Sequence, residues 1–170
     1  MKINAFAFAI ALLLTLLGAP LSAQAQTHVG TFTDWNAFTD TEGSAKVCYI
    51  GSNPQKSLPA NVTRGNAYIL VTHRPAAKSL GVVSIEAGYT YKDGSDAEVA
   101  IEGKPAIKFY SKGGQAWAHD DAQAVTALKA GKSMVVKGTS SRGTVTTDTY
   151  SLAGFTAAYQ AIDKACGVTR

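Results

Sequence analysis

Residues 154–167 read GFTAAYQAIDKACG, and this segment decides how the chain closes on itself. Phe155, Tyr159, Ile162 and Cys166 recur at the spacing of one helical stripe. The pattern predicts a C-terminal helix that begins at the first glycine of the segment and stops at the last one, because glycine commonly ends helices in a left-handed conformation. The Cys166 sulfur is then expected on the apolar side of this helix, facing the core.

The other end of the chain has the pattern of a secretion signal. Lys2 is followed by an apolar run over residues 5–17, and residues 23–25 read AQA, with small residues at the two positions that a signal peptidase reads. We expect residues 1–25 to be a signal peptide and residues 26–170 to form a single mature β-domain. An uncleaved anchor is disfavoured because a membrane span needs about 20 apolar residues. The mature protein is therefore expected to be periplasmic or secreted, with no membrane span.

The chain has two cysteines, Cys48 and Cys166. An even number of cysteines in an exported protein indicates a disulfide, and two cysteines leave one intramolecular pairing. Cys48 lies in KVCYI, residues 46–50, a strand-like run, so the bond would join the terminal helix to the first predicted hairpin. Two buried free thiols are the alternative. A redox-active pair is disfavoured because the sequence has no Cys-x-x-Cys.

Between these ends the chain is rich in short β-like runs separated by turn residues. Turn signals every 8–12 residues favour an antiparallel β-sandwich or barrel over parallel β/α units. We predict a mainly β fold of about eight strands, with a short inserted helix over Asp121–Ala130 that Asp120 caps, and the C-terminal helix. The β-like runs fall at residues 30–38, 46–51, 67–73, 81–91, 98–102, 106–110, 115–118, 133–138 and 144–152. Residues 39–44 and 52–66 are expected to be loops.

Composition excludes several classes of protein. With 46% hydrophobic and 16% charged residues, the chain is not expected to be disordered. Without Lys2, the mature part has 15 Lys and Arg against 12 Asp and Glu, which gives a net charge of 15 − 12 = +3. These cations are scattered, whereas nucleic-acid binding needs them clustered with stacking aromatics. No nucleic-acid partner is therefore expected.

Three residues are candidates for binding. His73 and Arg74 end an apolar run before a proline, where they would form a cationic, anion-binding tip, although a capping or surface pair is the favoured interpretation. Trp117 would anchor a partner if it lay at the surface, since tryptophan is enriched at interface hot spots, although core packing is favoured. His119 precedes the predicted cap and lacks the spacing of a metal site. No metal and no cofactor are expected.

The usual catalytic constellations are absent from the sequence. There is no Gly-x-Ser-x-Gly or Ser-x-x-Lys motif, and nothing marks a base for the serines of the loop over residues 140–143. The chain is therefore expected not to be an enzyme. Two alternatives stay open: an envelope-acting hydrolase or isomerase with His73 or His119 as base, and a small-ligand carrier that uses a barrel interior.

An ordered set of short motifs resembles one family. In chain order they are Asp34-Trp35, KVCY at 46–49, VTHRP at 71–75, AGYTY at 87–91, AWA at 116–118, MVVKGTS at 134–140, RGT at 142–144, TDTYSL at 147–152, GFTAAY at 154–159 and Ala165-Cys166. Together they look like the invasion-associated locus B family of exported bacterial proteins.

This resemblance implies a small, mostly β protein of the periplasm or outer surface, with the two cysteines as a structural pair and no assigned catalytic residue or cofactor. The expected function is thus that of an exported, non-enzymatic invasion-associated locus B-like protein. It would serve as a binding module whose partner is an envelope or host protein.

Overall fold

The computed structural model describes residues 26–102 and 104–169. The predicted signal peptide, residues 1–25, lies outside the described residues. The strands are β1 (Thr27–Phe32), β2 (Trp35–Glu42), β3 (Ala45–Ser52), β4 (Lys56–Leu58), β5 (Tyr68–Arg74), β6 (Ser79–Glu86), β7 (Asp96–Ile101), β8 (Ile107–Lys112), β9 (Gln115–Ala118), β10 (Ser133–Thr139) and β11 (Val145–Ser151). The helices are α1 (Asp121–Ala130) and α2 (Phe155–Ala165), with a 3-10 turn, η1, over Pro75–Ala77.

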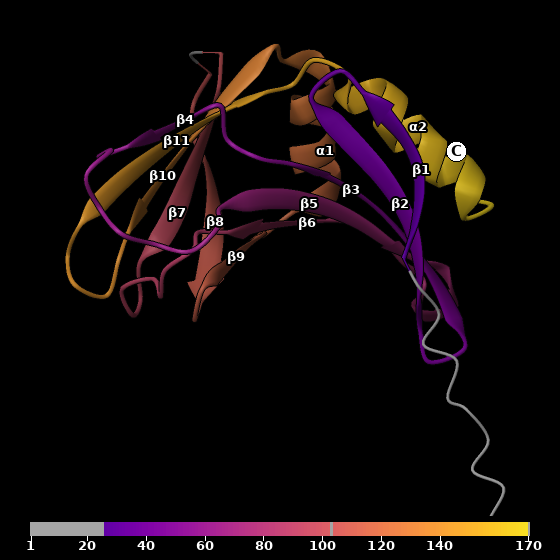
Figure 1. Cartoon of the computed structure of the whole chain (residues 1–170), viewed down its shortest axis with the longest axis horizontal. Helices are drawn as coiled ribbons and strands as arrows, with labels where there is room; N and C mark the ends of the chain where they lie inside the picture. The colour runs from indigo at the N-terminus through magenta and orange to yellow at the C-terminus, as the bar shows by residue number, and fades with distance from the viewer. Residues whose placement is uncertain (1–25, 103, 170) are drawn as a thin grey trace, which may run out of the picture.

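These eleven strands form one sheet in the order β1-β2-β3-β5-β6-β9-β8-β7-β10-β11-β4. Every pairing between neighbours is antiparallel. Figure 1 shows that the sheet bends strongly, so that β1–β3 and the β10–β11–β4 part stand on opposite sides of the molecule. Within the described residues the sheet is open, with β1 and β4 as its edges. The predicted mainly β, antiparallel fold is confirmed in its sandwich-like form, and the closed-barrel alternative is wrong.

The core lies on one face of this bent sheet. Along β7 the side chains of Ala97, Val99 and Ile101 are buried while Glu98 between them is exposed, as the alternation of a strand requires. The largest fully buried aromatic side chains are Trp35, Phe109, Tyr150, Phe155 and Tyr159. Burial of this apolar surface is the main stabilising contribution to the fold.

Both helices pack into the same core. The side chain of Asp120 accepts a hydrogen bond from the Gln123 amide (2.9 Å), so the predicted N-cap of α1 is confirmed. α2 packs on β1, β2 and β3 through its predicted apolar stripe (Figure 1). Gly154, just before α2, has a φ of 90°, and a Cβ there would lie 1.9 Å from the carbonyl oxygen of Phe32. Only glycine fits this junction.

Cys48 of β3 and Cys166, directly after α2, are joined by a disulfide with a Cα–Cα distance of 6.0 Å. The predicted bond between the terminal helix and the first hairpin is therefore present. Next to it, the Lys46 side chain donates to the carbonyl oxygen of Ala165 (2.6 Å), which satisfies an unpaired carbonyl at the end of α2.

Several predicted boundaries are wrong. The run at residues 30–38 is divided between two strands, because Thr33 turns the chain with a φ of 53°. The predicted loop at 39–44 is mostly β2, which continues to Glu42. The predicted loop at 52–66 contains β4, which pairs with β11 through its backbone although its side chains are mostly exposed. The run at 81–91 ends as a strand at Glu86.

Candidate functional site

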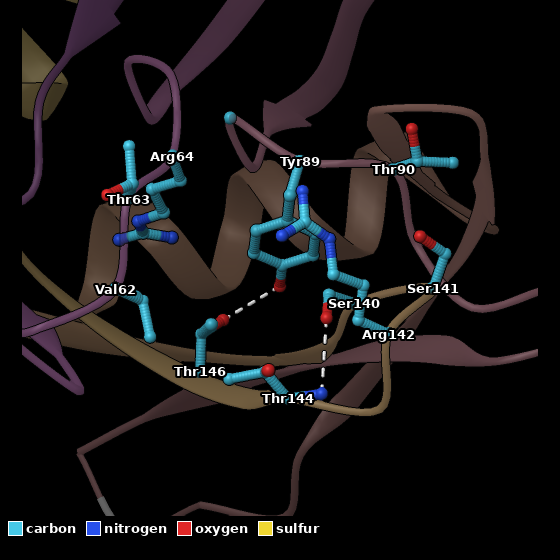
Figure 2. Close-up of a pocket in the computed structure, with 11 residues that line it drawn as sticks. Val62, Thr63, Arg64, Tyr89, Thr90, Ser140, Ser141, Arg142, Thr144 and Thr146 are labelled. Carbon is cyan, nitrogen blue, oxygen red and sulfur yellow. Dashed lines mark hydrogen bonds between the residues drawn. The ribbon is translucent and has the colours of Figure 1, made fainter.

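A polar cleft of about 520 Å³ lies between the segment that joins β4 to β5, the segment that joins β6 to β7, and the β10–β11 hairpin. Its lining residues are Val62, Thr63, Arg64, Gly88, Tyr89, Thr90, Ser140, Ser141, Arg142, Thr144 and Thr146 (Figure 2). We call it the arginine cleft. Its volume falls within the range of small-molecule sites, about 300–1,000 Å³.

Backbone hydrogen bonds hold both walls of the arginine cleft to the segment after β6. On the side of Arg64, the Gly65 amide donates to the Gly88 carbonyl (2.8 Å). On the other side, the Ser141 amide donates to the Thr90 carbonyl (2.7 Å). A Cβ on Gly88 would lie 2.2 Å from the Gly65 carbonyl oxygen, so the close approach of these two backbones needs glycine. Walls fixed in this way lose little conformational entropy when a ligand binds.

Arg64 anchors one wall through a partly buried ion pair with Asp148 of β11. Its Nη1 donates to Asp148 Oδ2 (2.9 Å), and its Nη2 donates to Oδ1 of the same carboxylate. The exposed fractions of the two side chains are 11% and 5%. The hydrogen bond to Asp148 raises the pKa of Arg64 above its already high value, so the guanidinium stays charged. Asp148 neutralises this charge, and Arg64 adds little net positive charge to the cleft.

Tyr89 projects into the arginine cleft from the segment after β6 (Figure 2). Its hydroxyl lies 2.7 Å from Thr146 Oγ1, and the Arg64 guanidinium lies 5.9 Å from its ring centroid. A Cβ at Gly138 of β10 would lie 2.4 Å from the Tyr89 hydroxyl, so a larger residue there would force the Tyr89 side chain to shift. Burial raises the pKa of Tyr89, so its phenol is protonated near neutral pH.

Arg142 stands on the tight turn of the β10–β11 hairpin. The turn is closed by the Ser140 amide donating to the Thr144 carbonyl (2.8 Å) and by the Thr144 amide donating to Ser140 Oγ (3.1 Å). Arg142 itself is exposed. Among residues 26–102 and 104–169, no ion pair of its guanidinium is found. The cleft therefore presents one uncompensated positive charge on a rigid support.

The lining of the arginine cleft consists mainly of hydrogen-bonding and cationic groups. They include hydroxyls and guanidinium groups but no carboxylate, imidazole or thiol. Of the groups that commonly serve in general acid–base catalysis, the described lining residues include the Tyr89 phenol alone. Elsewhere in the described part of the chain, no group of three or more potential metal ligands is found.

A comparison of the sequence with models of protein families gives a match over most of the chain. The family model described as Invasion associated locus B (IalB) protein matches residues 35–163. The chain belongs to the IalB family. The resemblance drawn from the ordered motifs is thereby confirmed.

One solved structure similar to this IalB-family chain is the crystal structure of invasion associated protein B from Bartonella henselae. The two share 19% sequence identity with a TM-score of 0.60, and the match covers 80% of this chain and 95% of that chain. At this identity the likeness shows the fold alone. A search of curated proteins finds no match.

His73 of the IalB-family chain lies in the core, not at the surface. Its side chain has an exposed fraction of 0%, its Nδ1 accepts from the Gly81 amide (2.8 Å), and its Nε2 lies 2.9 Å from Asp163 Oδ1. With Nδ1 accepting, the neutral ring donates from Nε2 to the carboxylate. The favoured interpretation as a capping or surface residue is wrong, because His73 points to the face that α2 covers and meets the Tyr159 ring edge-on at 5.2 Å.

Arg74 follows His73 but points to the outer face of the sheet. Its Nε donates to both carboxylate oxygens of Glu42 (3.1 and 3.0 Å), and its Nη2 donates to Oε1 (2.8 Å). The hydrogen bond to Glu42 raises the pKa of Arg74, and the same bond lowers the pKa of Glu42. The two residues form an exposed ion pair, so this arginine is already compensated.

Trp117 is half-buried on the outer face, where its ring stacks on Tyr110 at 5.5 Å. Tyr110 is 45% exposed and lies 5.3 Å from the exposed His119 ring. The favoured interpretation of Trp117 as a core residue is wrong, because in β9 it alternates with the buried Ala116 and Ala118. Its role in binding a partner stays a prediction. Neither Trp117, His73 nor Arg74 lines the arginine cleft.

Sequence reasoning missed the residues that form the cleft. One signal was available: Asp148 shares the strand face of Tyr150 and Thr146, so it is an acid at a position expected to be buried. A buried carboxylate needs a cationic partner. The sequence does not say that this partner is Arg64, 84 residues earlier.

Proposed function

We propose that this IalB-family chain is an exported, non-enzymatic binding protein of the periplasm or the cell exterior, and that its ligand occupies the arginine cleft. The observation that carries the proposal is Arg142, an exposed guanidinium without an ion-pair partner in the described residues, placed on a hydrogen-bonded turn over a concave site. Such convergent polar groups in a preformed pocket are typical of ligand sites.

The disulfide supports the exported part of this proposal. Cys48 and Cys166 are bonded, and structural disulfides persist in oxidising compartments. The helices of the described residues are too short, or too polar, to cross a bilayer. The disulfide agrees with the predicted signal peptide, and we expect the processed protein in the periplasm or the medium.

The two alternative functions are less well supported. The hydrolase or isomerase hypothesis needs an accessible base, but both ring nitrogens of His73 are engaged in the core, and His119 lies outside the arginine cleft. A carrier that uses the interior needs an internal cavity, but the inside of the bent sheet is filled by apolar side chains. Because the arginine cleft lies at the surface and needs no internal cavity, binding of a small ligand there stays part of the proposal.

The test measures retention by envelope material. Protein expressed from the full chain is recovered by cell fractionation, checked for the oxidised disulfide by intact mass, and added to washed envelope fractions. We expect saturable retention that Arg142→Gln weakens at least about tenfold, the loss expected when one charged hydrogen-bonding group is removed. Lys137→Gln is the matched control, because it removes the same charge from an exposed position of β10 outside the cleft.

Three results would contradict the proposal. Equal retention of Arg142→Gln and the wild type would exclude the cleft as the binding site. Recovery of the protein only from the cytoplasm would contradict export. Release of chemically changed envelope material during the incubation would contradict the non-enzymatic role.

A further inference from the structure

We infer that the arginine cleft recognises an acidic saccharide residue, a sugar ring that carries one carboxylate, such as a hexuronate. This inference rests on the proposed function, because it takes the arginine cleft as the ligand site. It adds the chemical class of the ligand, and three features of the cleft support it independently.

The first feature is the net charge of the lining. Arg64 is neutralised by Asp148, whereas Arg142 has no ion pair in the described residues, so the cleft carries one free positive charge. The lining holds no carboxylate that would repel an anion. The planar fork of a guanidinium matches a carboxylate with two parallel hydrogen bonds. A ligand with a single carboxylate therefore complements this site.

The second feature is the density of hydroxyl groups. Thr63, Thr90, Ser141 and Thr144 line the cleft, and no hydrogen bond of their hydroxyls is found within the described residues. A hydroxyl is at once a donor and an acceptor. Sugar hydroxyls have the same double capacity, so a sugar ring can pair with several of these groups. An apolar ligand would bury them without partners, at a cost in affinity.

The third feature is the aromatic ring of Tyr89. It lies between Arg64 and the Ser140–Thr144 turn in Figure 2, with its hydroxyl directed to Thr146. Its position is fixed, because the hydroxyl is hydrogen-bonded and the ring meets Tyr91 at 5.2 Å. A rigid ring with an apolar body and a polar tip can pack against the C–H face of a sugar while its polar neighbours bind the hydroxyls.

The test compares three small probes: glucuronate, glucose and acetate. Oxidised, 15N-labelled protein expressed from the full chain is titrated with each probe, and amide shifts are followed by NMR. We expect glucuronate to shift amides around Thr63, Tyr89 and Ser141 with saturation, at a dissociation constant at least about tenfold below those of glucose and acetate. Arg142→Gln should weaken glucuronate at least about tenfold, whereas Lys137→Gln should leave it unchanged.

A second variant separates the sugar from its charge. Ser141→Ala removes one exposed hydroxyl and leaves Arg142 in place. We expect it to weaken glucuronate several-fold while the weak acetate binding is unchanged, because acetate has no hydroxyl to pair. Arg142→Lys keeps the charge but loses the fork, and it should weaken glucuronate less than Arg142→Gln does.

Each other outcome overturns the inference. Equal affinity for glucose and glucuronate would show that the cleft does not recognise the negative charge of the ligand. Equal affinity for acetate and glucuronate would show an anion site without sugar recognition. No shift with any probe would exclude acidic saccharides. These outcomes do not decide the proposed function. That function is tested by Arg142-dependent retention on envelope material, which is measured without assuming any ligand.

Discussion

Asp148 is the acid on which the arginine cleft depends. It is 5% exposed, and its carboxylate binds Arg64, whose Nη1 also donates to the Ala87 carbonyl (3.1 Å). This pair holds the segment after β4 against β11 and against the end of β6. Such a pair contributes little net stability as a whole, but removal of one partner leaves the charge of the other without a counter-ion in a partly buried place.

We expect Asp148→Asn to lower the free energy of unfolding by about 1–3 kcal/mol, because the partly buried Arg64 then loses the carboxylate that accepts its hydrogen bonds. Urea denaturation followed by circular dichroism measures the change. The matched control is Asp96→Asn, which removes a carboxylate from an exposed pair with Lys108 and should change stability by about 0–1 kcal/mol. Equal effects of the two substitutions would contradict the structural role given to Asp148.

Two buried tyrosines make the fold sensitive to alkali. Tyr91 and Tyr150 are 2% and 0% exposed, and burial raises the pKa of both phenols far above the ordinary value. The unfolded chain loses these protons near pH about 10, whereas the folded chain keeps them. Above that pH the unfolded state binds fewer protons, so the free energy of unfolding falls as the pH rises. Below it, this contribution to stability is fully present.

The expected observation is a urea midpoint that falls between pH of about 8.5 and 11, with late tyrosinate absorbance that appears only as the protein unfolds. The double variant Tyr91→Phe, Tyr150→Phe should show a smaller fall. If all tyrosines of the folded protein titrated together near the ordinary value, the burial of these two would be in doubt.

Helices were the elements that the sequence specified best. The apolar spacing that ends in Cys166 is confirmed as α2, and Asp120 followed by Gly131 marked both ends of α1. Helix ends have local chemical signals, because unpaired amides and carbonyls favour particular side chains. β4 has no such signal. Its sequence, KSL, forms a strand because its backbone pairs with the backbone of β11.

We expect Asp120→Ala to destabilise the protein by about 0.5–2 kcal/mol, because the Gln123 amide loses its acceptor. Gln123→Ala is the control at an exposed position of the same helix and should have an effect within about 0.5 kcal/mol. Denaturant midpoints of the two variants give the comparison. A larger loss from the control than from the cap variant would contradict the capping role.

At the scale of the molecule, the disulfide closes almost the whole described chain into one loop. Cys48 and Cys166 are 118 residues apart. We expect the double variant Cys48→Ser, Cys166→Ser to lose about 4–5 kcal/mol of unfolding free energy, mainly through greater freedom of its unfolded state. Urea unfolding of the oxidised wild type, with and without a reducing agent, checks this value. A loss below about 1 kcal/mol would show that packing of α2 suffices without the bond.

The site was hidden from sequence reasoning for a topological reason. Arg64, Tyr89 and Arg142 come from three connections far apart in the sequence, and the order of strands in the sheet brings them together. Antiparallel patterning predicts strands but not which strands become neighbours. The motifs of the family resemblance contained Tyr89 and Arg142, yet nothing in them indicated a shared cleft.

One feature of the topology also sets the time at which the cleft is completed. β4 and β5 are consecutive along the chain, but β4 pairs with β11 at one edge while β5 lies between β3 and β6 (Figure 1). The stretch that carries Arg64 cannot reach its final position until β11, which follows β10 in the chain, has been synthesised. A polypeptide that ends before β11 therefore lacks the partner strand of β4 and cannot form the arginine cleft.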